Sequence, residues 1–205
     1  MLRMYSFRTA KRAINTEAAF IQQLAAKYDM PESWIRAILL KEMTEIDLLD
    51  IMADIMVNLW HGYYRVTGKE PCFRGSFFGK RDSSTGWSQI FGYVAINAIN
   101  RAVDRGLTDY ATLGIETDHR LRGENPEDLW LVWHRLNRDR HFNIEMCALN
   151  LLSCAEEMNG HTDIMNFSEE ETRRTFTRYN ADVRNVTHYG ELVHHFHQEY
   201  QKQNL

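Results

Sequence analysis

The sequence predicts a mainly α-helical single domain, and three observations support this. Apolar residues recur at intervals of three and four through most of the chain, the spacing that gives a helix one apolar face. The chain has only three prolines, Pro31, Pro71 and Pro126, and they punctuate the helical segments. Four glycines fall in one stretch, 68–86, which predicts a loop. The chain shows no internal repeat and no long linker, and its 205 residues suit one domain with a sizeable core.

Two helices are expected in the first part of the chain, over 16–28 and over 34–43. Two alternatives stay open beyond them. Thr44 can cap a new helix, with Asp47 in the capping-box position three residues later. Otherwise one unbroken helix continues to about Leu59, since neither Gly nor Pro intervenes.

The rest of the chain predicts further helices around one loop. The glycine-rich stretch suggests a short hairpin around 72–78, and a helix follows from about Phe91 to a stop at Gly106. Residues 107–124 are expected to be irregular. The remaining helices are expected from Asn125 toward Arg138, from about Asn143 to Asn159-Gly160, from the cap Ser168, and from Tyr189 to Gln201.

Composition and charge argue against several classes of partner. The net charge is −4 and the pI is about 6.1, which do not indicate nucleic acid binding. No apolar run approaches the ~20 residues that span a bilayer, so no stable membrane insertion is expected. The first residues lack the apolar core of a Sec signal. Cys72, Cys147 and Cys154 form no even framework, and we expect a reducing compartment, with Cys147 and Cys154 in the core.

Glu42 is the first candidate for chemistry. On a helix it falls in line with apolar residues, whereas Arg36 and Lys41 lie off that face and are expected to reach water. A carboxyl group turned toward a core loses hydration, which raises its pKa and suits it to act as a general acid. A helix end near Thr44 would raise the pKa further through the helix dipole. The alternative is a buried Glu held by an Arg or a backbone N–H.

Five short motifs occur in an order that resembles a known family. They are the segment Ala25–Ile38 followed by Glu42, then Gly86-Trp-Ser-Gln89, Asn143-Ile144, Tyr179-Asn180 and Tyr189-Gly190. In this order they resemble the lysozyme-like lytic transglycosylases and goose-type lysozymes over roughly residues 18–200. The resemblance implies a lysozyme-like α+β single domain, mainly helical, with a small glycine-rich loop or hairpin region. It also implies that Glu42 is the catalytic acid.

The match has departures and extra segments. Met43 stands where the family usually has Ser, Trp87-Ser88 replaces Leu-Met, and the Gly expected soon after Tyr179-Asn180 is missing. These differences bear on substrate details more than on the reaction. Within a domain spanning 1–205, we interpret 1–15 as an N-terminal extension and 44–67 and 107–128 as elaborations.

A second carboxylate would distinguish a hydrolase from a transglycosylase. A hydrolase uses it to activate water or to stabilise the developing cation, and Asp82, in a polar loop, is the first candidate. Glu45 and Asp47 are alternatives because they lie close to Glu42 in the sequence. Asp82 is equally explained as a turn or cap residue. The family's transglycosylases manage without this group, because the sugar's own 6-hydroxyl attacks internally.

Several polar and aromatic residues are candidates for substrate binding. Tyr179 is expected to hydrogen-bond Glu42 or the sugar, and Asn180 to support the backbone. Aromatic rings can stack on sugar faces, although each one also suits the core. The predicted substrate-binding residues are Ser88, Gln89, Tyr93, Asn143, Tyr179 and Asn180, with Phe91 and Trp87 as further aromatic candidates.

Two other clusters have simpler interpretations. His194 and His197 share a helix face with His188 and His195 nearby, so a metal site is conceivable, but a solvated terminal helix explains them as well. We expect neither a metal nor a cofactor. Met52 and Met56, one helical turn apart, are interpreted as core residues.

The sequence therefore predicts a peptidoglycan-cleaving enzyme that acts on the β-1,4 bond between N-acetylmuramic acid and N-acetylglucosamine. We expect a lytic transglycosylase rather than a hydrolase, since no second carboxylate is firmly placed. It would be made in the cytoplasm and reach the cell wall or periplasm as a phage endolysin or as a delivered antibacterial effector. An effector would have an immunity protein as partner. The alternative is an inactive lysozyme-fold protein that binds peptidoglycan or has a structural role.

Overall fold

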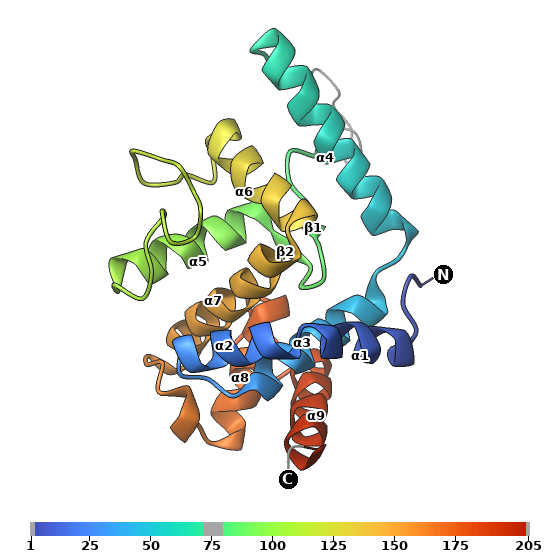
Figure 1. Ribbon diagram of the computed structural model, residues 1–205, viewed down its shortest axis with the longest axis vertical. Helices are drawn as coiled ribbons and strands as arrows, with labels where there is room; N and C mark the ends of the chain where they lie inside the picture. Colours follow the sequence, from blue (N-terminus) through green and yellow to red (C-terminus); the bar gives the residue numbers. More distant parts are fainter. Residues whose placement is uncertain (1–2, 72–79, 204–205) are drawn as a thin grey trace.

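The computed structural model describes residues 3–71 and 80–203, and this part of the chain is mainly helical, as the sequence predicts (Figure 1). Helices surround a central pair, α3 and α7, and one small hairpin lies beside them. The elements are α1 (Phe7–Thr16), α2 (Ala18–Lys27), α3 (Glu32–Glu45), α4 (Leu48–Thr67), β1 (Ser84–Thr85), β2 (Ile90–Phe91), α5 (Gly92–Asp104), α6 (Pro126–Arg138), α7 (Arg140–Asn159), the 3₁₀ helix η1 (Ile164–Asn166), α8 (Glu169–Asn180) and α9 (His188–Gln203).

Helix α3 runs through the core and is covered on all sides. It packs against α1, α2, α7 and α9. The expectation that Arg36 and Lys41 reach water is wrong, because both are buried. Helix α9 covers their side of α3, with Tyr200 beside the Arg36 guanidinium and Tyr189 beside the Lys41 ammonium. Each charge keeps a carboxylate one turn away on α3, Glu32 for Arg36 and Glu45 for Lys41. Such pairing is what allows a charged group to be buried.

The N-terminal segment is part of the core. The Ser6 side chain accepts a hydrogen bond from the backbone N–H of Thr9 and so caps α1. Ala10 and Ile14 on this helix are fully buried, and α1 packs on α3. The described part of 1–15, interpreted from the sequence as an extension, thus contributes to the packing around α3.

The helix is interrupted at Ile46 and Asp47, which separate α3 from α4. Asp47, rather than Thr44, caps α4: its carboxylate accepts from the backbone of Leu49 and Asp50, and the Asp50 carboxylate accepts from the backbone N–H of Asp47. The alternative of one unbroken helix to Leu59 is therefore wrong. The break places Glu42 in the last turn of α3, as the first alternative required.

Helix α4 projects away from the helical body (Figure 1). Asp54 anchors it, because the carboxylate accepts hydrogen bonds from the side chains of Ser83, Thr85 and Asn137 on the hairpin side and on α6. The interpretation of Met52 as a core residue is wrong, since its side chain is exposed. A helix that contacts the body along one narrow side leaves its other apolar residues in solvent.

The hairpin of the described residues is formed by β1 and β2, which pair antiparallel with Thr85 opposite Ile90. The hairpin expected around 72–78 lies outside the described residues. Helix α5 follows directly from β2 and ends before Gly106, which adopts a left-handed backbone conformation as expected of a helix stop.

In the second half of the chain, capping residues largely determine where the helices begin. Asn125 caps α6, and Ser168 with Glu171 forms a capping box at α8, as predicted. Helix α7 begins at Arg140, earlier than expected, because the Asp139 side chain accepts from the backbone N–H of Phe142. Cys147 and Cys154 are buried free thiols on α7, as predicted. Among the described helices, none is long and apolar enough to cross a membrane.

Candidate functional site

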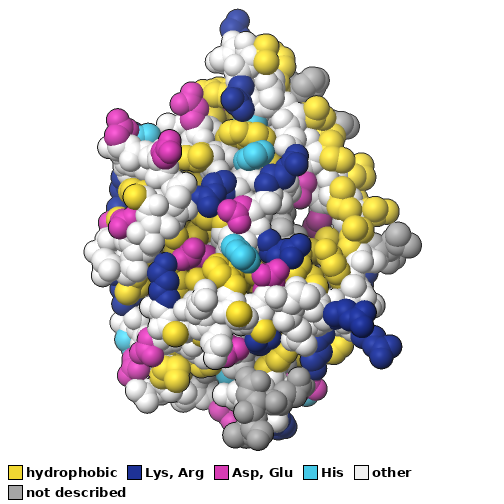
Figure 2. All heavy atoms as spheres, in the orientation of Figure 1, with side chains coloured by type: hydrophobic (Ala, Val, Ile, Leu, Met, Phe, Trp, Pro, Cys, Tyr) yellow, Lys and Arg dark blue, Asp and Glu magenta, His cyan; other side chains and the backbone are white. Residues whose placement is uncertain are grey.

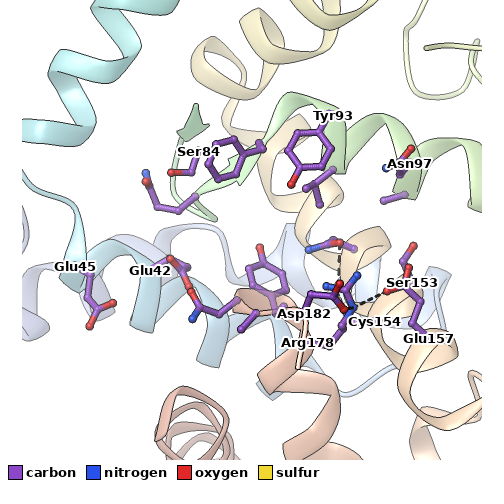
Figure 3. A pocket seen from close by; sticks show the side chains of 18 of the residues that line it. Glu42, Glu45, Ser84, Tyr93, Asn97, Ser153, Cys154, Glu157, Arg178 and Asp182 are labelled. Atoms are coloured by element: carbon purple, nitrogen blue, oxygen red, sulfur yellow. Dashed lines mark hydrogen bonds and ion pairs between the residues drawn. The ribbon is translucent and has the colours of Figure 1, made fainter. Parts of the chain in front are cut away.

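A cavity of about 520 Å³ lies between α3, the hairpin, α5, α7 and α8 (Figure 3). Glu42 and Glu45 lie toward one end, Tyr93 and Asn97 project from α5, and Arg178 and Asp182 lie toward the other end. The lining residues are Glu42, Glu45, Ile46, Asp47, Asp50, Ser84, Gln89, Phe91, Tyr93, Val94, Asn97, Ala98, Arg101, Asn150, Ser153, Cys154, Glu157, Arg178, Tyr179, Asn180, Ala181 and Asp182.

Glu42 combines enclosure with access to this cavity. Its side chain lines the cavity, while its neighbours on α3, Lys41 and Met43, are buried. Burial raises the pKa of Glu42 from about 4.5 to about 7, as the sequence predicted in direction. This pKa is the net result: the negative charges of Glu45 and Asp50 also raise it, whereas the Lys41 charge and a hydrogen bond from Tyr189 lower it. Such a group can give up a proton and take one back near neutral pH.

Tyr189 holds the Glu42 carboxyl group. Its hydroxyl donates a hydrogen bond to Oε1 of Glu42, and its ring is buried between α3 and the start of α9. The sequence assigned this hydrogen bond to Tyr179, and that alternative does not hold: the Tyr179 hydroxyl donates to the backbone oxygen of Ser88, 2.9 Å away. Tyr189 was noted as part of a motif, but the pairing of α9 with α3 is a long-range contact that no local pattern reveals.

Removing the Tyr189 hydroxyl tests this positioning role. Because the hydrogen bond lowers the pKa of Glu42, we expect Tyr189→Phe to raise that pKa, which the NMR titration profile of the Glu42 carboxyl carbon measures. The control is Tyr200→Phe on the same helix, because the buried Tyr200 hydroxyl has no partner among the described residues. An unshifted profile in Tyr189→Phe would contradict the role.

Asn143 and Ser88 fix the hairpin instead of facing the cavity. Asn143 is buried on α7, and its side-chain oxygen accepts from the backbone N–H and the hydroxyl of Ser88, at 2.9 and 2.8 Å. Its amide nitrogen donates to the backbone oxygens of Thr85 and Leu136. The prediction that Asn143 and Ser88 bind substrate is therefore corrected: neither lines the cavity, and all of these groups are occupied within the protein. They hold the segment that carries Gln89.

Gln89 lies in the cavity wall with a backbone conformation that is rare for its type. Its φ is 46°, in the left-handed region, and its side-chain nitrogen donates to the Gly86 backbone oxygen at 2.8 Å. Gly86 also has a positive φ, and a Cβ there would lie 2.1 Å from the Asn143 amide nitrogen. The turn is thus tightly constrained, and constrained backbone of this kind is concentrated at functional sites. Gln89 lines the cavity, and its role in binding substrate stays a prediction.

The aromatic candidates divide into two groups. Tyr93, 49% exposed, and Phe91 line the cavity with tilted rings whose centroids are 5.8 Å apart. Tyr179 and Asn180 also line it, at the C-terminal end of α8. Trp87 does not: its ring packs under the Arg140 guanidinium, 4.4 Å from the centroid. The prediction that Trp87 stacks on a sugar in this cavity is therefore wrong.

The acidic candidates for a second carboxylate have structural roles. Asp82 accepts from the backbone N–H groups of Gly92 and Tyr93, at 2.8 and 3.0 Å, and so caps α5; it does not line the cavity. The sequence alternative for Asp82 is a turn residue that caps its loop, and the structure gives it a structural role at α5 instead. Burial raises the pKa of Asp82 to about 6. Glu45 and Asp47 do line the cavity, but Glu45 pairs with Lys41 and Asp47 caps α4.

The end of the cavity far from Glu42 carries residues that sequence reasoning missed. The Arg178 guanidinium lies between two carboxylates, 2.6 Å from Glu157 and 3.8 Å from Asp182 (Figure 3). The sequence contains one signal for the residues of this wall, namely their regular spacing on single helices. Tyr93, Asn97 and Arg101 recur every four residues on α5, and Asn150, Ser153 and Glu157 recur every three or four on α7. The row on α7 interrupts a buried face, whereas the row on α5 lies on the side of that helix opposite its buried face.

The histidines of α9 are mostly structural. His194 and His197 are buried, the ring of His197 hydrogen-bonds the Ser33 hydroxyl at 2.9 Å, and burial lowers the pKa of His197 to about 4. His195 pairs with Glu199 on the surface. Within the described residues, no group of three or more His, Cys, Asp or Glu is arranged to hold a metal ion.

Comparison with known proteins gives no match: neither a family model, nor a curated protein, nor a solved structure is significantly similar to this chain.

Proposed function

We propose that this protein is a lysozyme-like peptidoglycan lytic transglycosylase that cleaves the β-1,4 bond between N-acetylmuramic acid and N-acetylglucosamine. The observation that carries the proposal is the Glu42 carboxyl group, with a pKa of about 7, at one end of a cavity lined by aromatic, amide and charged side chains. The order of the five motifs is consistent with this function. Two of the motifs contribute residues at Glu42: Tyr189 donates a hydrogen bond to it, and Gln89 lines the same cavity.

The proposed reaction uses one residue twice. Glu42, protonated, donates its proton to the glycosidic oxygen as the bond to C1 of the muramic acid breaks, and the N-acetylglucosamine leaves with a 4-hydroxyl. The Glu42 carboxylate then takes the proton from the muramic acid 6-hydroxyl, whose oxygen forms a bond to C1. The product is a 1,6-anhydro end, no water is consumed, and Glu42 returns to its protonated form. Tyr189 keeps the carboxyl group oriented through both steps.

The roles of the other carboxylates favour a transglycosylase over a hydrolase. Asp82 is occupied in capping α5, and Asp47 and Asp50 cap α4 reciprocally. Glu45 is paired with Lys41. An internal attack by the 6-hydroxyl benefits from proximity and needs no separate base to activate water. Among the described residues that line the cavity, the other carboxylates are Glu157 and Asp182, which flank Arg178 at the end far from Glu42.

The remainder of the cavity is suited to a polar glycan. Tyr93 and Phe91 offer exposed aromatic faces against which the C–H groups of a sugar ring can pack. Gln89, Asn97 and Asn150 supply amide groups for hydroxyl and N-acetyl groups. A cavity that joins apolar faces to a few placed polar groups is the usual form of a small-molecule site.

Activity should depend on the protonated form of Glu42. We expect kcat/KM to fall as the pH rises through about 7, because the raised pKa keeps the acid protonated only below that pH. Glu45→Gln removes a charge that raises this pKa, so the limb should move to lower pH in that variant. Initial rates on labelled peptidoglycan between about pH 3.5 and 9 check this. A limb near the ordinary Glu value of 4.5 would contradict the environment assigned to Glu42.

The proposal is tested by release of soluble fragments from purified, dye-labelled peptidoglycan. Walls of several chemotypes should be used, since the sequence departures at Met43 and Trp87 bear on substrate details. We expect the wild type to solubilise at least one chemotype. Binding without release on every wall would overturn the proposal and favour the alternative of an inactive lysozyme-fold binding protein.

A further inference from the structure

Helix α4 exposes a continuous row of large apolar side chains. Figure 2 shows hydrophobic side chains gathered along the edge where Figure 1 places α4. Apolar residues scattered singly on a surface are ordinary, whereas a contiguous row of large ones marks an interaction site. The row consists of Leu48, Leu49, Met52, Ile55, Leu59, Tyr63 and Val66, each 42–86% exposed.

The spacing of this row indicates what covers it. Alternating steps of four and three residues are the seam of a coiled coil, in which apolar positions of one helix insert between those of another. At Gly62, an added Cβ would meet nothing within 4 Å, so the backbone is open to a close neighbour. The seam consists of Leu48, Met52, Ile55, Leu59, Gly62 and Val66.

We propose that α4 pairs antiparallel with α4 of a second copy of this chain. With the two-fold axis level with Val57, Leu48 of one copy lies opposite Val66 of the other, Met52 opposite Gly62 and Ile55 opposite Leu59. Every seam position then meets a seam position, as an isologous interface requires. The seam contains no charged residue, so two copies meet without repulsion.

Charge agrees with this occupant. Helix α4 begins with Asp47 and Asp50 and carries Arg65 in its last turn. Antiparallel pairing brings the basic end of each helix near the acidic end of the other, whereas parallel pairing would bring like charges together. An anionic bilayer is disfavoured, since Asp50 and Asp54 lie on the polar side of α4 and interfacial helices carry Lys and Arg there.

The oligomeric state tests the proposal. By analytical ultracentrifugation, we expect a wild-type dimer at micromolar concentration and a dissociation constant raised at least about 100-fold in Leu59→Glu. Met165→Glu is the matched control, because Met165 is 58% exposed but lies on η1. Far-UV circular dichroism checks that both variants fold. A wild-type monomer at about 100 µM, a dimer unaffected by Leu59→Glu, or a monomer that floats with lipid vesicles would each overturn the pairing.

Cross-linking tests the direction of the pairing. Leu48→Cys combined with Val66→Cys should give a disulfide-linked dimer on oxidation, because the two positions meet across the axis. Leu48→Cys alone should not, since the two copies of position 48 would be about 27 Å apart at 1.5 Å per residue. The wild type, oxidised in parallel, controls for its own cysteines. A covalent dimer from the single variant, or none from the double variant, would overturn the antiparallel arrangement. Neither cross-linking result depends on Glu42, so the proposed dimer and the proposed catalytic activity are tested independently.

Discussion

Replacing Glu42 with Gln is expected to lower the rate of peptidoglycan cleavage by roughly 10³-fold or more, which is what positioned acid–base catalysis contributes. Glutamine keeps the shape of the side chain and can still accept the hydrogen bond from Tyr189. It cannot supply or take a proton at the glycosidic oxygen. Initial rates of fragment release, compared at the pH optimum of the wild type, measure the effect.

The same substitution should stabilise the fold at neutral and alkaline pH, which separates lost chemistry from lost structure. The pKa of Glu42 is higher in the folded state, about 7, than the 4.5 of an ordinary Glu. Stability from this group is therefore present below about pH 4.5 and is lost as the pH rises through about 7. At pH 8 we expect Glu42→Gln to unfold with about 1–3 kcal/mol higher free energy than the wild type. Full cleavage activity in a folded variant would remove Glu42 from the reaction.

Replacing Gly190 with Ala is expected to disturb both the fold and the site. A Cβ at Gly190 would lie 2.1 Å from the Thr177 hydroxyl oxygen and 2.7 Å from the Arg173 backbone oxygen. Helix α9 must then move away from α8, and Tyr189 moves with it. We expect unfolding to cost about 2–4 kcal/mol less than in the wild type, a Tm lower by roughly 5–10 °C, and weaker cleavage. Thermal and denaturant unfolding measure the change.

Gly62→Ala is the matched control for this effect. An added methyl group there meets nothing within 4 Å, and alanine favours a helix interior by about 0.5–1 kcal/mol. We expect this variant to be at least as stable as the wild type. Equal stability of the Gly190 and Gly62 variants would mean that α8 and α9 can separate freely and that the position of Tyr189 does not depend on their close contact.

The helices could be predicted from the sequence mainly where a capping residue marks their start. Asn125 and Ser168 mark the starts of α6 and α8. The break before α4 was misplaced because Thr44 and Asp47 are both plausible caps. Thr44 instead donates its hydroxyl to backbone oxygens within α3. Local side-chain hydrogen bonding alone does not distinguish Thr44 from Asp47 as the cap of α4. The direction of the chain after Ile46 places the cap at Asp47.

The burial of α3 and the exposure of α4 could not be predicted from periodicity. Arg36 and Lys41 lie off the apolar face of α3, yet tyrosines of α9 cover them. Met52 lies on the apolar face of α4 and is exposed. A periodic pattern identifies which face of a helix is apolar, but the tertiary arrangement determines what packs against that face.

The candidate site could be predicted only in part. The inward position of Glu42 followed from the helical face, and Gln89, Tyr93, Tyr179 and Asn180 do line its cavity. Ser88 and Asn143 belong to the motifs Gly86–Gln89 and Asn143-Ile144, which predict that both residues bind substrate. They are buried partners of each other, joining segments 55 residues apart. Such a pairing of distant polar residues leaves no local signal.

The most direct test is digestion of purified peptidoglycan in H₂¹⁸O, followed by mass spectrometry of the released fragments, with the wild type and Glu42→Gln in parallel. We expect 1,6-anhydromuramic ends without ¹⁸O from the wild type and none from the variant, because the attacking oxygen comes from the sugar. Reducing muramic ends that contain ¹⁸O would show hydrolysis and contradict the transglycosylase. Equal release by both proteins would contradict the assignment of Glu42 as the acid.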